Sequence, residues 1–260
     1  MVISPFTTTD SAVREVTKTA LYGHSGVGKT TAIGDYYNKW GKGLILSGEA
    51  GLASLSNIEI DYLPFHSFNR SIKDRYSFVD LMRYVSSDEF KKREYKWLAV
   101  DSCTELSQRC FEDAEIETKD HPSNFEIWNV YGANIRKTLK WIRDRDCHVI
   151  CTFLADSQED ANGVNKVMPM MTQAKIAKWV PSLFDYVFAL VRTSDEEGGK
   201  TVVRRQIYTE GVKGWIGKAR DPHRRLAPVE TTDKVTDLLE KVMMTKDQFQ
   251  NMQKKGASNE

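Results

Sequence analysis

Gly-His-Ser-Gly-Val-Gly-Lys-Thr occupies residues 23–30 and matches the pattern G-x-x-x-x-G-K-[ST] at every fixed position. The short apolar run at residues 19–22 is suited to a β-strand, and residues 31–40 can form a helix. A strand, this loop and then a helix form the context in which the pattern is a phosphate-binding loop (P-loop). The alternative is a glycine-rich turn that binds nothing, and the complete match favours the P-loop.

The chemistry of phosphate binding explains each fixed residue of this loop. Gly23, Gly26 and Gly28 allow a tight turn in which successive N–H groups face phosphate oxygens, and the helix that follows adds its positive N-terminal dipole. Lys29 is expected to reach the β- and γ-phosphates, and the Thr30 hydroxyl to bind Mg²⁺. The sequence therefore predicts a nucleoside triphosphate site made of Gly23, His24, Ser25, Gly26, Val27, Gly28, Lys29, Thr30 and Thr31.

Composition is that of one globular α/β protein. The 260 residues are 40% hydrophobic and 28% charged, with a net charge of +1, which suits one large domain or a core with a small appendage. No apolar run is long enough to cross a bilayer, and the N-terminal residues lack the pattern of a signal peptide. We expect a cytoplasmic protein without membrane contact.

The chain has four cysteines, too few for a disulfide scaffold, and they stand in apolar segments as reduced core thiols would. Cys147 and Cys151 lie four apart with His148 between them, which raises the alternative of a metal site. The segment reads as a strand, however, and a strand sends alternate side chains to opposite faces. Core thiols are the favoured interpretation.

Strand-like and helix-like segments alternate along the chain, which predicts a doubly wound, mostly parallel sheet flanked by helices, with ligands at the carboxyl ends of the strands. We expect a lead-in at residues 1–16, the ATPase domain at 17–230, and at 231–260 a C-terminal helix followed by fifteen residues without regular structure. The strands are expected near residues 17–22, 44–47, 58–68 (at an edge, because of Pro64), 97–100, 148–154, 186–191 and 201–208; the helices near 31–40, 76–95, 104–117, 125–145, 173–180 and 232–244.

Two carboxylates follow predicted strands. Asp101 ends the continuous apolar run Trp97-Leu98-Ala99-Val100, and an acid at the end of a buried strand beside a P-loop can support a nucleotide-bound Mg²⁺. Its alternative role is to cap the next helix, as Ser102 also could. Glu49 follows the strand at residues 44–47 and could orient and polarise the attacking water; the alternative is an exposed loop glutamate.

This order of motifs resembles the RecA-type ATPase core. In that family a glutamate at the position of Glu49 activates water, and the Walker B aspartate corresponds to Asp101. The likeness over residues 17–225 is closest to compact phage-encoded RecA-like ATPases associated with single-strand annealing recombination. Their pattern includes a strand of the form Phe-Asp-x-Val, here residues 184–187, and a late Lys-x-Arg motif, here Lys218-Ala219-Arg220. Where the family often has a polar Gln or His sensor, this chain has Thr152.

The resemblance also implies how the protein assembles and what it contacts. Nucleotides lie between subunits in such rings and filaments, so Lys218 and Arg220 would act on the γ-phosphate of a neighbour; their alternative is that of surface charges on a loop. By order along the chain, residues 118–125 and 155–171 correspond to the DNA-contacting loops, although the second carries acidic as well as basic residues. Trp128, Tyr131 and Trp141 have helical spacing, which favours core packing over base stacking.

Basic residues gather late in the chain. Residues 200–225 carry a local excess of +6, which suggests a surface facing phosphates, although a solvated basic face is the alternative. The eight basic residues, set against Glu210 and Asp221, are Lys200, Arg204, Arg205, Lys213, Lys218, Arg220, Arg224 and Arg225.

Together these features predict an ATP- and Mg²⁺-dependent hydrolase of the RecA-like type. The leading hypothesis is action on single-stranded DNA in recombination, repair or replication, as a homo-oligomer, with an annealing or single-strand-binding protein as partner. The alternative is a nucleotide-dependent switch or assembly factor that acts on a protein. A packaging or helicase motor is less favoured, because 260 residues leave no room for a second nuclease or primase-like domain. ATP is preferred over GTP because no Asn-Lys-x-Asp motif is present.

Overall fold

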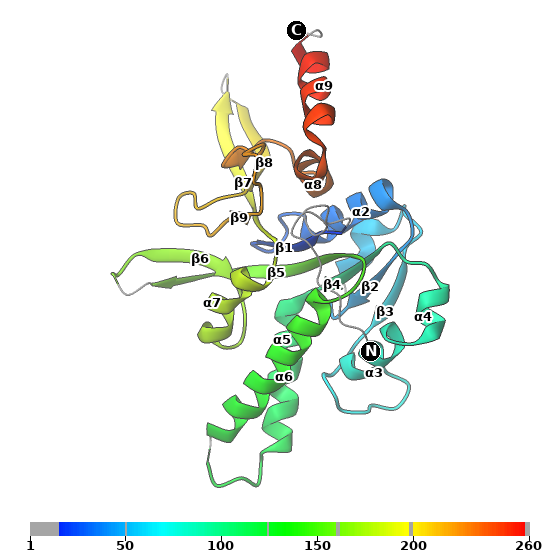
Figure 1. Ribbon diagram of the computed structural model, residues 1–260. Coiled ribbons are helices and arrows are strands. Elements are labelled where there is room, and N and C mark those ends of the chain that lie inside the picture. Colours follow the sequence, from blue (N-terminus) through cyan, green and yellow to red (C-terminus); the bar gives the residue numbers. More distant parts are fainter. Residues whose placement is uncertain (1–15, 50, 124, 160–161, 198–199, 258–260) are drawn as a thin grey trace, which may run out of the picture.

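Ten strands form the central sheet of the computed structural model, which describes residues 16–49, 51–123, 125–159, 162–197 and 200–257. The strand order is β10-β8-β7-β1-β5-β4-β2-β3, with β6 paired to β5 and β9 paired to β7 (Figure 1). The lead-in was expected at residues 1–16, of which residues 1–15 lie outside the described part of the chain.

Six of these strands run parallel and hold the buried centre of the sheet. The continuous apolar runs of β2 and β4 reflect burial on both faces. Strand β3, which ends in Pro64 and is partly exposed, is the edge strand that the proline predicted. The parallel strands are β1 (Lys18–Gly23), β2 (Gly43–Ser47), β3 (Asp61–Pro64), β4 (Trp97–Asp101), β5 (His148–Glu159) and β7 (Tyr186–Glu197). The antiparallel strands are β6 (Asn165–Pro169), β8 (Lys200–Tyr208), β9 (Lys218–Ala219) and β10 (Val229–Glu230).

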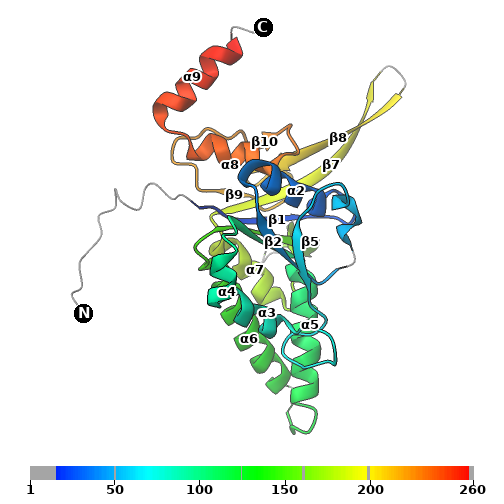
Figure 2. The same cartoon turned by 90° about the vertical axis from the view of Figure 1, so that its right-hand side faces the viewer.

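Helices cover both faces of the sheet, so the doubly wound, mostly parallel fold is confirmed (Figure 2). One layer holds α2 (Lys29–Trp40), the 3₁₀ turn η1 (Gly51–Leu55) and α8 (Val235–Met243), which share a hydrophobic cluster. The other layer packs into the larger cluster and comprises α3 (Phe78–Val85), α4 (Asp88–Lys92), α5 (Cys103–Glu117), α6 (Phe125–Arg143) and α7 (Ala174–Leu183).

Three expected segments differ from the structure. The helix expected at residues 76–95 is two helices, because Ser87 starts α4 anew by accepting a hydrogen bond from the Phe90 N–H. Within the segment 155–167, which was expected as a loop, residues 155–159 and 165–167 belong to the paired strands β5 and β6. Helix α7 continues through Pro181 to Leu183 and does not stop at the proline.

The C-terminal part is more ordered than expected. Val235, Leu238 and Leu239 of α8 are buried against α2, so the hydrophobic core continues past residue 230. Where fifteen residues without regular structure were expected, helix α9 spans Lys246–Ala257. Arg225 joins the two helices: its guanidinium donates to the carbonyls of Lys241 and Val242 and lies over the ring of Phe249.

All four cysteines are free; Cys103, Cys110 and Cys151 are buried, and Cys147 is partly exposed. No group of three or more His, Cys, Asp or Glu side chains in the described residues is arranged to hold a metal ion. Within that same part of the chain, no helix is long and apolar enough to span a membrane.

Candidate active site

The predicted P-loop connects the end of β1 to the start of α2. Gly26 and Gly28 have φ angles of 73° and 110°, which side-chain-bearing residues rarely adopt. At Gly23 a Cβ atom would lie 2.4 Å from the carbonyl oxygen of Leu190, so only glycine lets β7 approach the loop. Val27 is buried and anchors the loop, while His24, Ser25 and Gly26 are exposed. The exposed backbone and the start of α2 fit a phosphate chain.

Lys29 is the first residue of α2 and its side chain folds back over the loop. The Nζ atom donates to the carbonyls of Gly23 at 3.0 Å and His24 at 2.9 Å. Burial lowers the pKa of Lys29, and the carboxylates of Glu49 and Asp101 oppose that shift. The ammonium therefore lies among phosphate-binding groups, with both predicted acidic residues close enough to act on it.

Asp101 is buried at the end of β4 and meets the P-loop helix directly. The Thr30 hydroxyl donates to Asp101 Oδ2 at 2.9 Å, and the buried Thr152 hydroxyl donates to Asp101 Oδ1. Burial raises the pKa of Asp101, while these two hydrogen bonds lower it. Thr30 and Asp101 thus present two hard oxygen donors side by side, which is the donor set that Mg²⁺ prefers.

Glu49 is exposed and stands beyond the end of β2, next to Asp101. Ser102 donates from its hydroxyl to Glu49 Oε1, and Ser47 donates to the Glu49 carbonyl at 2.8 Å. The Ser102 hydroxyl also accepts from the Glu105 N–H at 3.2 Å, so Ser102 is the N-cap of α5. The capping role considered for this position therefore belongs to Ser102, which at the same time holds the Glu49 carboxylate at the edge where Thr30 and Asp101 meet.

Strand order explains this convergence. Strand β5 lies between β1 and β4, and β2 follows β4, so the carboxyl ends of these strands share one edge of the sheet. Residues far apart in the chain meet there. The arrangement can bind a triphosphate, hold a divalent cation beside it and offer a carboxylate to a water molecule.

Lys218 and Arg220 lie at the opposite edge. Strand β9 pairs with the first residues of β7, at the amino ends of the parallel strands. Lys218 donates to the carbonyls of Pro181 and Phe184 at the end of α7, and Arg220 Nη1 lies 3.1 Å from Asp185 Oδ1. Neither residue joins the P-loop of its own chain.

The suggested DNA-contacting segments also have clear places. Residues 118–123 lie between α5 and α6, and residues 155–159 and 165–169 belong to the paired strands β5 and β6. Tyr131 is fully buried, and Trp128 packs against the rings of Phe111 and Tyr131 while remaining 39% exposed. Tyr131 is therefore a core residue, as its spacing favoured.

Two neighbours of the P-loop, Trp215 and Arg205, were not predicted from the sequence. The ring of His24 meets the ring of Trp215 edge-on, with centroids 5.3 Å apart. The Arg205 guanidinium lies beside Gly28: its Cζ is 3.5 Å from the place a Cβ on that glycine would take. Both come from parts of the chain nearly 200 residues away, and no local motif marks them.

The sheet, the P-loop and the carboxylate of Asp101 at a strand end form the arrangement of a P-loop ATPase. Residues 15–220 match the family model described as the AAA domain. The chain belongs to this AAA domain family and is an ATP-hydrolysing enzyme.

Solved structures with a similar arrangement are distant. A KaiC-like protein from Pyrococcus horikoshii has a TM-score of 0.40 at 15% identity, covering 74% of this chain and 76% of that one. The flagellar accessory protein FlaH from Methanocaldococcus jannaschii has a TM-score of 0.36 at 8% identity, covering 82% and 88%. An ATPase from the type III secretion system of pathogenic bacteria has a TM-score of 0.43 at 17% identity, covering 67% and 51%. No curated protein matches the sequence.

Proposed function

We propose that this ATPase cleaves the β–γ bond of ATP with Mg²⁺ at the edge formed by β1, β4 and β2. The observation that carries this proposal is the 2.9 Å hydrogen bond from the Thr30 hydroxyl to Asp101 Oδ2. The Glu49 carboxylate lies beside this pair, where it accepts a hydrogen bond from the Ser102 hydroxyl. Lys29 binds the β- and γ-phosphates, and Thr30 and Asp101 hold the metal, directly or through water. Bound Mg²⁺ would offset the negative charge of the phosphates.

Glu49 is the proposed general base. Its carboxylate accepts a proton from water as the water oxygen attacks the γ-phosphorus, and the bridging oxygen leaves with ADP. Exposure suits this role, because water has access to the carboxylate, and the bond from Ser102 limits its orientations.

Substitution of Glu49 by Gln tests this assignment. Glu49→Gln keeps the shape of the side chain and removes the base, so nucleotide binding should persist while turnover falls by about 100-fold or more. Glu59→Gln, at another exposed glutamate, is the matched control and should hydrolyse ATP normally. Turnover of Glu49→Gln at the wild-type rate, measured by phosphate release, would show that another group takes the proton.

We further propose that hydrolysis serves recombination or repair on single-stranded DNA, in the cytoplasm, with an annealing or single-strand-binding protein. The support is the resemblance to phage-encoded ATPases carried by residues 184–187 and 218–220, together with the basic residues of the segment 200–225. The alternative, a nucleotide-dependent switch acting on a protein, shares the same site and differs only in what stimulates it.

The ATPase rate with and without single-stranded DNA across a salt series separates the two. DNA binding through phosphates weakens steeply as salt rises, so stimulation that fades between about 50 and 200 mM salt is expected for the DNA role. A rate indifferent to DNA at low salt would favour the protein switch.

A further inference from the structure

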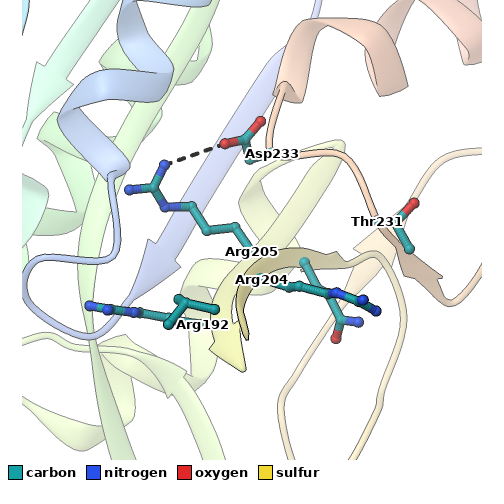
Figure 3. A pocket seen from close by; sticks show the side chains of 7 residues that line it. Arg192, Arg204, Arg205, Thr231 and Asp233 are labelled. Atoms are coloured by element: carbon teal, nitrogen blue, oxygen red, sulfur yellow. Dashed lines mark hydrogen bonds and ion pairs between the residues drawn. The ribbon is translucent and has the colours of Figure 1, made fainter. Parts of the chain in front are cut away.

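Strands β7 and β8 place two arginines directly opposite each other. Arg192 pairs with Arg205 in the antiparallel register, so both side chains lie on the same face of the hairpin. Figure 3 shows Arg192 and Arg205 extending to one side of the hairpin and Arg204 extending to the other. Like charges directly opposite on one face destabilise a sheet. Such a pair is favourable where an anion binds between or beside the two guanidinium groups.

The face that carries these arginines meets the P-loop of the same chain. The Arg205 guanidinium lies against Gly28, within van der Waals reach of a Cβ there. Its partner in this structure is Asp233, with Nη1 and Oδ2 3.4 Å apart and side chains 45% and 50% exposed. Such an exposed ion pair contributes little, so a phosphate oxygen can replace Asp233 at small cost.

The strands on the two sides of β1 indicate the direction in which a nucleotide would lie along the P-loop. Asp101 and Glu49 follow β4 and β2, and the γ-phosphate must lie near them for hydrolysis. Strand β7 lies on the other side of β1. A triphosphate whose γ end points toward β4 therefore leads its α end toward β7 and β8, where Arg192 and Arg205 stand.

A cavity of about 490 Å³ opens at this place. It lies between the β7–β8 hairpin and the segment after β10, and its size suits a small ligand. Polar and charged groups dominate its walls, as a nucleoside with hydroxyl and ring nitrogen atoms requires. The lining residues are Arg192, Val203, Arg204, Arg205, Gln206, Thr231 and Asp233.

We propose that Arg205, with Arg192 beside it, binds the α-phosphate end of the nucleotide in the same subunit, and that this cavity receives the nucleoside. The inference rests on the proposed binding of a triphosphate at the P-loop. It assigns a second anchor for the nucleotide, distinct from Lys29 and from any arginine of a neighbouring subunit. Arg205 leaves Asp233 for the phosphate when the nucleotide binds.

Two ligands and four variants test the two halves of this proposal. ATP and inorganic triphosphate, each with Mg²⁺, are titrated calorimetrically into the protein. Arg205→Ala should weaken both ligands about tenfold, because a charge-assisted hydrogen bond to phosphate is lost. Arg93→Ala removes the same charge from an exposed position at the end of α4, which does not line the cavity, and should leave the affinity for both ligands unchanged.

Filling the cavity tests the nucleoside half. Thr231→Trp places a large ring in it and should weaken ATP about tenfold while sparing inorganic triphosphate, whose retained binding also shows that the variant is folded. Lys29→Ala should lose both ligands.

Two results would overturn this assignment, and a third would overturn the proposed function on which it rests. Arg205→Ala that binds both ligands as tightly as Arg93→Ala does would rule out the arginine contact. Thr231→Trp with wild-type affinity for ATP would remove the nucleoside from the cavity. A wild-type protein that binds neither ligand would instead overturn the proposed function itself, and so is distinguishable from the first two.

Discussion

At the scale of single residues, Asp101 carries opposing requirements. The proposed Mg²⁺ site requires an ionised carboxylate at Asp101, yet burial raises its pKa. The hydroxyls of Thr152 and Thr30 oppose this by donating to its two oxygens. In this structure the Thr152 hydroxyl stabilises the charged form of the neighbouring acid.

Thr152→Val should therefore shift the acid limb of the ATPase pH profile to higher pH. Without this hydrogen bond the charged form of Asp101 loses a stabilising donor, so its pKa should rise. The Mg²⁺ concentration needed below neutral pH should rise with it. Thr138→Val, a buried threonine of α6, is the control. An unmoved acid limb in Thr152→Val would mean that this hydrogen bond does not set the ionisation of Asp101.

At the scale of elements, the sequence predicted the helices and strands whose burial leaves a regular pattern of apolar residues. Strand β4 is an unbroken apolar run because both faces are covered, and the P-loop and Asp101 follow from such strands and their ends. The outer half of β5 resembles a loop in sequence because residues 155–159 are partly or fully exposed and mostly polar. The sequence places Arg205 in a basic segment that suggests a phosphate-facing surface, but no local motif connects it to the P-loop, because only the pairing of β8 with β7 brings it there.

Helix α2 carries an acidic residue, Asp35, whose charged form is disfavoured by its surroundings. Burial, together with the nearby carboxylates of Asp233 and Asp237 and against an opposing effect of Lys234, raises the pKa of Asp35 to about 6. The folded protein thus favours the neutral form of Asp35. Its contribution to stability is complete below the unfolded pKa of about 4 and is lost as pH rises through about 6.

Asp35→Asn should accordingly stabilise the protein above pH 6 and have little effect near pH 4. After allowance for solvent screening the gain is about 1 kcal/mol. Denaturant unfolding at pH 5 and pH 7.5 measures it, with Asp120→Asn, at an exposed position, as the control that should change neither value. A gain of equal size at both pH values would assign the effect to something other than ionisation of Asp35.

At the scale of the whole molecule, the two sets of candidate catalytic residues occupy opposite edges of the sheet. The P-loop, Asp101 and Glu49 stand at the carboxyl ends of the parallel strands, whereas Lys218 and Arg220 stand at the amino end of β7. One chain cannot bring the two edges together without breaking the sheet. Two chains can, if the carboxyl edge of one faces the amino edge of the next, and a head-to-tail contact of this kind builds a ring or a filament.

A mixing experiment tests whether Arg220 completes the site of a neighbour. Lys29→Ala lacks a working P-loop, and Arg220→Ala lacks the basic residue, so each protein alone should be inactive. In a mixture, interfaces that join an intact P-loop to an intact Arg220 should recover part of the ATPase activity, because a basic group supplied in trans stabilises charge on the transferred phosphoryl group.

Two controls make the result of that mixture decisive. Arg220 pairs with Asp185, so Asp185→Asn reports how much of the Arg220→Ala defect comes from losing this ion pair alone. Sizing with a non-hydrolysable ATP analogue shows whether the two variants assemble together. A co-assembled mixture as inactive as its parts would place Arg220 outside the chemistry and leave it the structural role its contact with Asp185 already supports. Recovered activity would mean that hydrolysis depends on assembly, because no single chain holds the complete site.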